Sequence, residues 1–379
     1  MKKSIVLGIM FTLLVGIFVF HTPNESNANE IFTHSESNLK KVIQKYFDME
    51  KVQYTLEGDI NTLNFDEVIN PKDKELKDYL VKKNILMQNR RKANGNKIKI
   101  IDRKLTYNDI EYIDNNAIAK LNVTDVLQYS NLTDPTFIST NYEITLEKNK
   151  DNKYVITNIV SDDVIDLYIK GKVDIDEAIE NDLKEIQKEK EINNSYSKDL
   201  ANFGVSEDIS TLSVNASLNR TNMYNYAQAN WNKRPSNWGN FDGMGGDCTN
   251  FISQIIYAGG APMDNTGSYQ WYYYGYSDRA PSWTSVRFLY EYLIGNTGVG
   301  PQGYRASTND MLYNMHRGDI IQIDFDSDGT YDHSTSIVNY QIGTLNNTTV
   351  AAHTNDVFNR PISDYPGTKR WIVLTGYMR

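Results

Sequence analysis

The stretch GMGGDCTNFISQIIYAGG, residues 243–260, contains the only cysteine of the 379-residue chain. Gly245 and Gly246 permit backbone angles that are closed to other residues. From Cys248 onward apolar residues recur at helical spacing until a second pair of glycines. The pattern predicts a buried helix that carries Cys248 in its first turn and is capped by the Asp247 carboxylate. Free amide groups and the positive end of the helix dipole favour a thiolate there, which suits a nucleophile.

Residues 1–28 have the pattern of a secretory signal peptide. Lys2 and Lys3 precede an apolar run, and Ser26 and Ala28 form a small-x-small cleavage site. An uncleaved N-terminal anchor is the alternative. We therefore expect a secreted protein, extracellular or cell-wall associated, with no stable membrane anchor after cleavage. A single cysteine in such a protein is a reactive group, an intermolecular bridge or an inert buried side chain.

Composition divides the rest of the chain into two halves, and all five tryptophans lie beyond residue 215. Residues 29–170 show helical patterns followed by alternating strands, which predicts an α+β accessory domain. Its order of elements resembles the cystatin-like and nuclear-transport-factor-like rolls. Residues 171–217 predict a charged helix and a linker, with permanent packing of that helix on a domain as the alternative. The net charge of −9 and the pI near 5.2 indicate no basic surface of the kind that binds nucleic acid, so no nucleic-acid partner is expected.

A thiolate enzyme also needs a base and a group that orients this base. His34 lies in the polar start of the mature chain and His316 in a polar approach to a strand, so both are expected on the surface. His333 begins the predicted strand HSTSIVNY, and His353 ends the next predicted strand. In an antiparallel hairpin the two are directly opposite if the turn is centred on Gly343, whereas a turn at the later Asn-Asn pair displaces them. The sequence leaves this register open.

Several motifs in a fixed order resemble a known family. GDCTNF at the helix start, GDIIQI, DHSTSIV and VAAHT look like the papain-like cysteine hydrolases of bacterial cell walls, the NlpC type. The segments GGDCTNFISQ, DGTYDHSTSIV and HTND are more similar still to the "Putative amidase domain" family of Gram-positive bacteria. The likeness covers residues 218–379. It implies an α+β domain with a papain-like, NlpC-type fold that hydrolyses an amide bond in cell-wall peptide.

The resemblance implies that Cys248 is the nucleophile and His333 the base. The third, polar group of the NlpC type matches His353 best; Asn355 is the second choice, because papain relatives use asparagine there, and Asp356 is a weaker third. The expected function is a secreted cysteine amidase or peptidase that acts on peptidoglycan peptide through an acyl-enzyme and requires no cofactor. A catalytically silent wall-binding protein and an acyltransferase are the alternatives.

The segment DFDSDGTYD, residues 324–332, has the spacing of a calcium loop. Its acids occupy the first, third, fifth and ninth places of an EF-hand-like loop, but Thr335 stands at the twelfth place, where such a loop requires a bidentate glutamate. An Asp-Gly hairpin turn with solvated acids is the other interpretation. On the first interpretation the sequence predicts a structural calcium site with four acidic ligands: Asp324, Asp326, Asp328 and Asp332.

Overall fold

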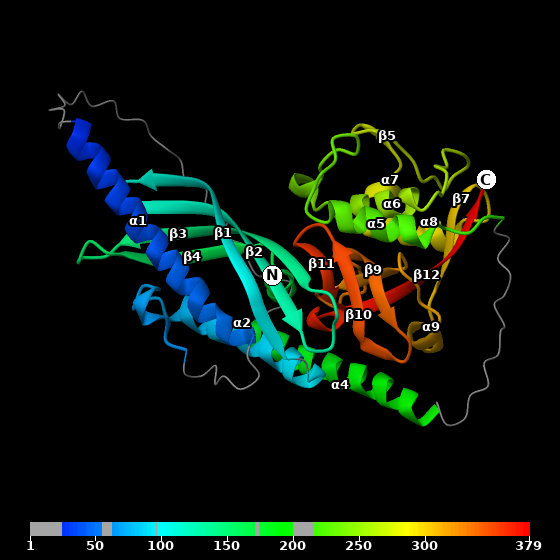
Figure 1. The fold of residues 1–379 in the computed structure, drawn as a ribbon, viewed down its shortest axis with the longest axis horizontal. Helices are drawn as coiled ribbons and strands as arrows, with labels where there is room; N and C mark the ends of the chain where they lie inside the picture. Colours follow the sequence, from blue (N-terminus) through cyan, green and yellow to red (C-terminus); the bar gives the residue numbers. More distant parts are fainter. Residues whose placement is uncertain (1–24, 55–62, 96, 171–173, 200–214) are drawn as a thin grey trace, which may run out of the picture.

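The computed structural model describes residues 25–54, 63–95, 97–170, 174–199 and 215–379, so most of the predicted signal peptide lies outside the described residues. One ten-stranded antiparallel sheet runs through the molecule in the order β1-β2-β3-β11-β10-β9-β8-β12-β7, with β4 paired to β3 (Figure 1). The predicted α+β class is confirmed. The strands of this sheet are β1 (Ile98–Ile113), β2 (Asn116–Tyr129), β3 (Thr136–Lys148), β4 (Tyr154–Ser161), β7 (Gly300–Arg305), β8 (Ile320–Asp324), β9 (His333–Gln341), β10 (Thr344–Ala352), β11 (Asp356–Pro361) and β12 (Thr368–Met378).

The helices lie on both sides of this sheet (Figure 1). None of them, among the described residues, is long and apolar enough to cross a membrane. A separate small hairpin is formed by β5 (Tyr273–Gly275) and β6 (Asp278–Arg279). The α-helices are α1 (Glu25–Glu50), α2 (Lys74–Asn94), α3 (Val164–Lys170), α4 (Ile175–Asp199), α5 (Arg220–Asn230), α6 (Cys248–Ala258), α7 (Pro281–Thr284), α8 (Val286–Gly295) and α9 (Thr308–Tyr313).

In the first half, α1 and α2 lie along one face of β1 to β4 (Figure 1). α2 begins after Asp73, whose side chain accepts the Leu76 N–H, and it ends at Gly95 in the left-handed conformation. β2 alternates buried and more exposed residues along most of its length, as expected for a strand with one face in a core. Its buried residues pack with apolar residues of α1, among them Ile43 and Phe47.

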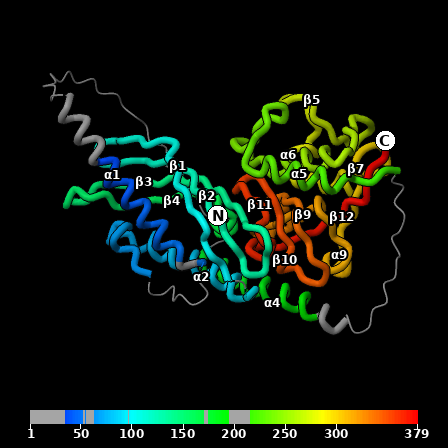
Figure 2. The backbone as a smooth tube through the Cα atoms, in the orientation of Figure 1, coloured from blue at the N-terminus to red at the C-terminus, as the bar shows by residue number. Residues whose placement is uncertain are grey.

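In the second half, α5, α6, α7 and α8 lie together on one face of the strands β8 to β12 (Figure 1, with the backbone of α5 and α6 in Figure 2). α6 is buried along most of its length, and its apolar residues Phe251, Ile252, Ile255 and Ile256 belong to the core of this half. This agrees with the helix predicted from the spacing after Cys248. The helix therefore fixes the position of the cysteine relative to the sheet.

The two halves share one sheet and one apolar core. β3 of the first half pairs with β11 of the second, with Val357 opposite Ile138. A large apolar core contains residues from both halves, including Tyr129 of β2, Tyr168 of α3 and Ile323 of β8. The first half is thus joined to the second by backbone hydrogen bonds and by buried side chains.

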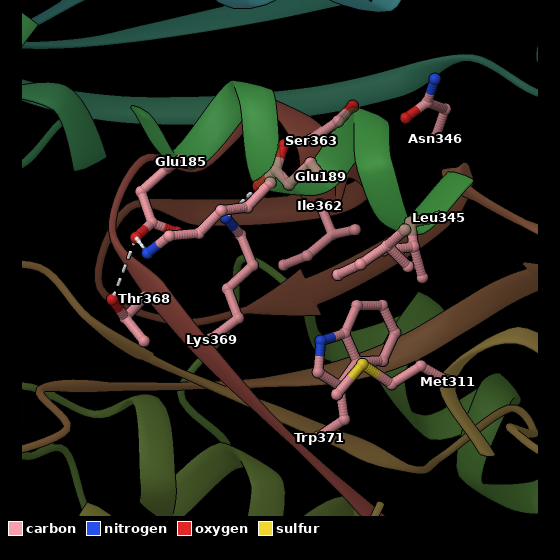
Figure 3. A pocket seen from close by; sticks show the side chains of 12 residues that line it. Glu185, Glu189, Met311, Leu345, Asn346, Ile362, Ser363, Thr368, Lys369 and Trp371 are labelled. Carbon is pink, nitrogen blue, oxygen red and sulfur yellow. Dashed lines mark hydrogen bonds and ion pairs between the residues drawn. The ribbon is translucent and has the colours of Figure 1, made fainter. Parts of the chain in front are cut away.

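The charged segment after residue 171 forms α4, and residues 200–214 lie outside the described residues. α4 packs against α2 and against the second half (Figure 3). Glu189 of α4 is ion-paired with Lys369 of β12 at 2.7 Å. The structure therefore shows the packed helix that the sequence left as an alternative to a free linker.

Most apolar residues of α4 face the core: Ile186 is buried, and Ile175 and Ile179 pack against the shared core. Leu183 is the exception, because it is 47% exposed whereas its neighbour Asp182 is buried. The reason is an ion pair: Arg90, itself fully buried in α2, donates from Nε to Asp182 Oδ1 at 2.6 Å. A buried charge requires such a partner, and this pair turns Asp182 inward and Leu183 outward.

The register of β9 and β10 answers the question left open by the sequence. The turn lies at Ile342 and Gly343, and two irregularities further along the hairpin set the pair Ala351 and Ser336 opposite each other. Continuing this register places His353 opposite Ser334. Because side chains alternate between the two faces of a strand, His353 and His333 point to opposite faces of the sheet.

Candidate active site

Cys248 is the first residue of α6 and is 4% exposed. The glycines before it, Gly245 and Gly246, have φ angles of 94° and 115°, which glycine adopts without strain. A β-carbon at Gly246 would also lie only 2.9 Å from Thr354 Oγ1. The two glycines therefore allow the chain to pass close to Thr354 before it enters the helix.

The polar surroundings of the thiol come largely from the start of β9. The backbone amide of Ser334 is hydrogen-bonded to Cys248 Sγ, and Thr249 Oγ1 lies 3.8 Å from the same sulfur. The hydroxyl groups of Thr249 and Ser334 are 3.1 Å apart. These contacts hold the cysteine beside Ser334, and hence near the preceding residue, His333.

Burial raises the pKa of the Cys248 thiol, and the hydrogen bonds from Ser334 and Thr249 offset this effect only in part. The sequence-based expectation of a thiolate favoured by the helix start is therefore not what the structure shows. The physical reason is that desolvation of the buried sulfur outweighs the helix dipole and the amide groups. We infer a neutral thiol at pH 7.

We expect the rate at which iodoacetamide alkylates Cys248 in the folded protein to be low at pH 7 and to keep rising above about pH 9, because only the thiolate reacts and a free thiol titrates near about 8.5. The rate is measured by intact-protein mass spectrometry across a pH series. The same chain unfolded in denaturant is the control, with a free thiol. A folded-state midpoint below that of the unfolded chain would contradict the pKa shift described here.

His333 is the first residue of β9 and is 3% exposed. Its ring packs near the rings of Phe325 and Tyr365, with ring centroids 5.9 Å and 6.2 Å away. Burial, together with the nearby Arg360 guanidinium, lowers the pKa of His333 to about 4. Its Nε2 atom has no hydrogen-bond partner among the described residues. His333 is therefore a neutral imidazole at pH 7 with one ring nitrogen that no described residue engages.

Cys248 and His333 line one cavity of about 360 Å³, which is within the range of small ligand sites. The cavity lies where the start of α6 meets the start of β9. The structure thus brings the predicted nucleophile and the predicted base to the same space. The remaining lining residues are Leu167, Gly245, Phe325, Asp326, Asp332 and Thr354.

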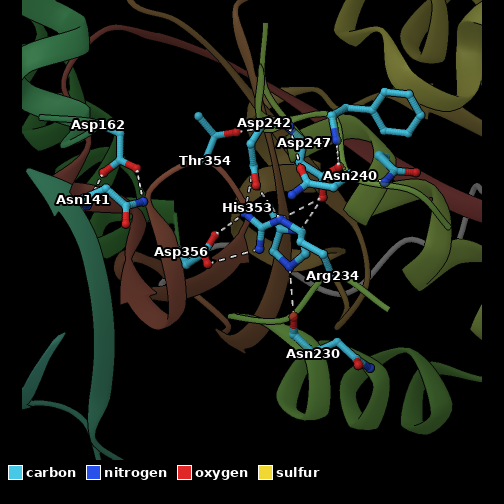
Figure 4. A network of polar contacts seen from close by, with 12 residues as sticks. Asn141, Asp162, Asn230, Arg234, Asn240, Asp242, Asp247, His353, Thr354 and Asp356 are labelled. Carbon is cyan, nitrogen blue, oxygen red and sulfur yellow. Dashed lines mark hydrogen bonds and ion pairs between the residues drawn. The ribbon is translucent and has the colours of Figure 1, made fainter. Parts of the chain in front are cut away.

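His353 faces a different environment (Figure 4). Its Nδ1 lies 2.6 Å from Asp247 Oδ2, and its Nε2 lies 2.9 Å from the backbone oxygen of Asn230. Both partners offer acceptor oxygens to the ring. The ring stacks on Phe251 with a centroid distance of 3.8 Å. In this structure His353 therefore orients the residue that precedes Cys248, and it does not line the cavity that contains His333.

Asp247 does not cap α6 as the sequence suggested, because its side chain makes no capping hydrogen bond. Its Oδ1 instead accepts from the Phe241 N–H at 3.0 Å and from Asn250 Nδ2 at 2.9 Å, and its Oδ2 faces His353. The buried carboxylate thus connects the loop before α6, the helix itself and the loop after β10. We interpret Asp247 and His353 as a pair that positions the nucleophile.

The other two candidates for the orienting group, Asn355 and Asp356, do not line the cavity. Asn355 donates to Thr140 Oγ1 of β3 and accepts from Arg360, both at 2.9 Å. Asp356 is ion-paired with Arg234 at 2.8 Å (Figure 4). These contacts hold β11 in place. No described contact joins either residue to His333.

Thr354 is a site residue that the sequence reasoning missed. Thr354 lies in the turn between β10 and β11, and it lines the cavity together with His333. Its Oγ1 accepts from the Asp247 N–H at 2.9 Å. The motif alone favoured histidine and asparagine because these side chains orient a base strongly. Only the folded turn after β10, which brings Thr354 to the cavity, indicates the threonine.

The predicted calcium ligands are only partly brought together. Asp324, Asp326 and Asp332 can each place one carboxylate oxygen within 4.8 Å of the others, whereas Asp328 is not in this group. Asp324 accepts backbone amides of Ser327 and Gly329, at 2.6 Å and 2.9 Å, as in an acid-stabilised turn. Burial raises the pKa of Asp324 and of Asp332, and the acids next to them add to the rise. The three carboxylates fit a cation, and calcium binding stays a prediction.

The second half of the chain is similar to known proteins. Residues 217–375 match the family model described as "Putative amidase domain". This amidase match indicates amide hydrolysis in general terms and confirms that part of the predicted resemblance. The "Uncharacterized protein YhbB" of Bacillus subtilis (strain 168) is 38% identical over 122 residues, which is 31% of this chain and 36% of the relative. The aligned part thus spans about a third of that relative's length.

No solved structure matches the chain. The kinship with the NlpC type and the papain-like fold therefore stay predictions. The amidase match begins close to the boundary at which the composition changes, and it contains both Cys248 and His333. The first half, with α1 to α4, lies outside it.

Proposed function

We propose that the chain is a secreted cysteine amidase or peptidase that hydrolyses an amide bond in cell-wall peptide. The observation that supports this most directly is the shared cavity: the only cysteine of the chain and a buried histidine with an unengaged Nε2 line the same space. The cysteine stands at a helix start, and the histidine stands at a strand start. The amidase match covers both residues.

The reaction follows from the protonation states of the two groups. Since the thiol and the imidazole are both neutral, His333 removes the proton from Cys248 as the sulfur attacks the amide carbonyl. The resulting imidazolium then donates this proton to the departing amine, and an acyl-enzyme remains. Water, deprotonated by His333, attacks the thioester and releases the acid and the free thiol. The Cys248 backbone N–H can donate to the oxyanion.

The positions of the other polar groups support this assignment of roles. The Thr354 hydroxyl accepts a hydrogen bond from the Asp247 N–H, and the His353 ring is hydrogen-bonded to the Asp247 carboxylate. Two side chains therefore fix the residue next to the nucleophile. Thr354 also lies on the cavity wall, in the turn after β10, and lines the same cavity as His333. We propose Thr354, in place of His353, as the polar neighbour of the base.

The cell-wall substrate and the extracellular location belong to the same proposal. They rest on the signal-peptide pattern of residues 1–28 and on the resemblance of the Cys and His motifs to wall hydrolases. An acyltransferase would use the same residues, with an amine in place of water in the second step. Product analysis distinguishes the two reactions.

A second candidate is a wall-binding protein without catalysis. The burial of Cys248 and the raised pKa of its thiol favour it, because an enclosed neutral thiol is ordinarily inert. The same observation is compatible with an enzyme only if substrate can enter the cavity. The two candidates therefore differ in a measurable property, the formation of product.

To test the proposal, the mature chain is incubated with purified peptidoglycan, and the soluble products are analysed by mass spectrometry. We expect fragments with new amino and carboxyl ends in the wild type and none in Cys248→Ala, because the acyl-enzyme cannot form. Met244→Ala, at an exposed position in the same loop, is the matched control and should retain activity. Binding without product in the wild type, or equal product from Cys248→Ala, would overturn the proposal.

A further inference from the structure

The catalytic cavity has a wall that comes from the first half of the chain. Leu167 of α3 lines it together with Cys248 and His333, although α3 lies outside residues 217–375, which match the amidase family. Leu167 is half-buried and packs against the core that both halves share. The active site described above is therefore built from residues on both sides of the compositional boundary.

α3 is held firmly in this position. Val164 and Ile165 are fully buried in the shared core. Asp166 accepts from Tyr79 Oη at 2.7 Å and from Lys83 Nζ at 2.9 Å, which ties α3 to α2. The Tyr168 hydroxyl donates to the backbone oxygen of Ala178 in α4 at 3.0 Å. A short helix with anchors on several neighbours presents its remaining apolar side chain, Leu167, at a defined place.

The cavity is lined by both apolar and acidic side chains. Leu167 and Phe325 are its large apolar side chains, whereas Asp326 and Asp332 are its carboxylates. Phe325 is itself buried in the shared core and packs near the His333 ring. An apolar group of a ligand held next to the reacting atoms would thus meet Leu167 from one half of the chain and Phe325 from the other.

We propose that Leu167 and Phe325 form a subsite for an apolar side chain next to the scissile amide, so that the first half of the chain helps to select the substrate. This inference rests on the proposed function. The substrate class it names is a peptide with an aliphatic side chain of moderate size beside the bond that is cleaved. The first half is then part of the enzyme's substrate site in addition to any role in binding or spacing.

The test compares two neutral electrophiles with the same reacting group, 2-chloroacetamide and N-isobutyl-2-chloroacetamide. Each alkylates the Cys248 sulfur and releases chloride, and the rates are measured by intact-protein mass spectrometry. The ratio of the two rates is divided by the same ratio for glutathione. We expect a preference of about tenfold for the isobutyl reagent in the wild type, since a hydrophobic pocket discriminates by about this factor for small apolar groups.

Leu167→Asn keeps the size of the side chain and removes its apolar character, so the preference should fall to about threefold or less. Leu167→Trp fills the space and should slow the larger reagent more than the smaller one. Leu183→Asn, at the exposed position on α4, is the matched control and should leave the preference unchanged. Thermal unfolding shows whether each variant is folded.

The outcomes separate this inference from the proposed function. If Cys248 reacts with both reagents and the preference is the same in Leu167→Asn as in the wild type, the subsite is overturned and the cysteine mechanism is not. If neither reagent reacts with the folded wild type, the thiol is sealed from ligands, and both proposals fail. A loss of preference confined to the Leu167 variants supports the subsite.

Discussion

Replacing His333 with alanine is expected to lower the rate of amide hydrolysis by about a hundredfold to ten-thousandfold, the usual contribution of a positioned general acid and base. The loss should fall mainly on kcat, because the imidazole acts on the proton of Cys248 and on the departing amine, whereas the cavity walls bind the substrate. Release of peptide fragments from peptidoglycan, followed with time at saturating substrate, measures the effect.

His316→Ala is the matched control for His333→Ala. His316 is 65% exposed and does not line the cavity, so its removal should leave the rate within about a factor of two, as for a surface substitution away from the site. Circular dichroism should show that both variants are folded. If His333→Ala retains most of the activity, another group takes the proton, and the assignment of the base is wrong.

Replacing His353 with alanine is expected to lower the free energy of unfolding by about 3 kcal/mol or more. The change removes a fully buried side chain that is hydrogen-bonded to Asp247 and leaves the buried Asp247 carboxylate without its nearest partner, and leaving a buried charge unpartnered typically costs about 3–5 kcal/mol. Arg234, whose Nε lies 3.4 Å from Asp247 Oδ2, can compensate only in part. Chemical unfolding at pH 7 followed by tryptophan fluorescence measures the loss.

An exposed ion pair gives the comparison for His353→Ala. Lys184 and Glu180 of α4 are 2.8 Å apart and both largely solvent-accessible, so Lys184→Ala should change the free energy of unfolding by less than about 1 kcal/mol. The double variant Asp247→Asn with His353→Gln should be more stable than the sum of the two single changes predicts. Strict additivity would show that the two side chains do not act as a pair.

The helix at Cys248 could be predicted because its information is local. Two glycines, the apolar spacing after Cys248 and the closing glycine pair all lie within residues 243–260, and the structure has α6 at that place. The protonation state of the thiol could not be predicted in the same way. It depends on how completely the β9 strand and the cavity walls enclose the sulfur, and residues from distant segments such as Leu167 decide that.

The residue that orients the base His333 could not be predicted from the sequence, for a different physical reason. The hairpin of β9 and β10 follows from the alternating pattern, but its register depends on two irregularities, between Thr344 and Thr349 and between Thr349 and Val350, that no motif indicates. A displacement by one residue exchanges the two faces of a strand. In the structure His353 lies on the Asp247 side, and the turn after β10 brings Thr354 to the cavity that His333 lines.

The joining of the two halves was also beyond the sequence. Strand patterns in β3 and β11 predict that each is a strand, but they do not name the partner, since main-chain hydrogen bonding is the same for any pair. The composition change near residue 215 suggested separate domains. It marks a change in residue usage, whereas the sheet and the shared core continue across it.

The pairing of β3 with β11 has a consequence for any attempt to study the two halves separately. A fragment limited to the residues that match the amidase family would end its sheet at β11, with the N–H and C=O groups that now bond to β3 exposed along an open edge. Open edges of this kind recruit strands from other molecules. Such a fragment would also lose Leu167 from its cavity wall. The pairing of β3 with β11 thus covers this edge and protects the full-length protein from self-association. The first half also completes the cavity wall.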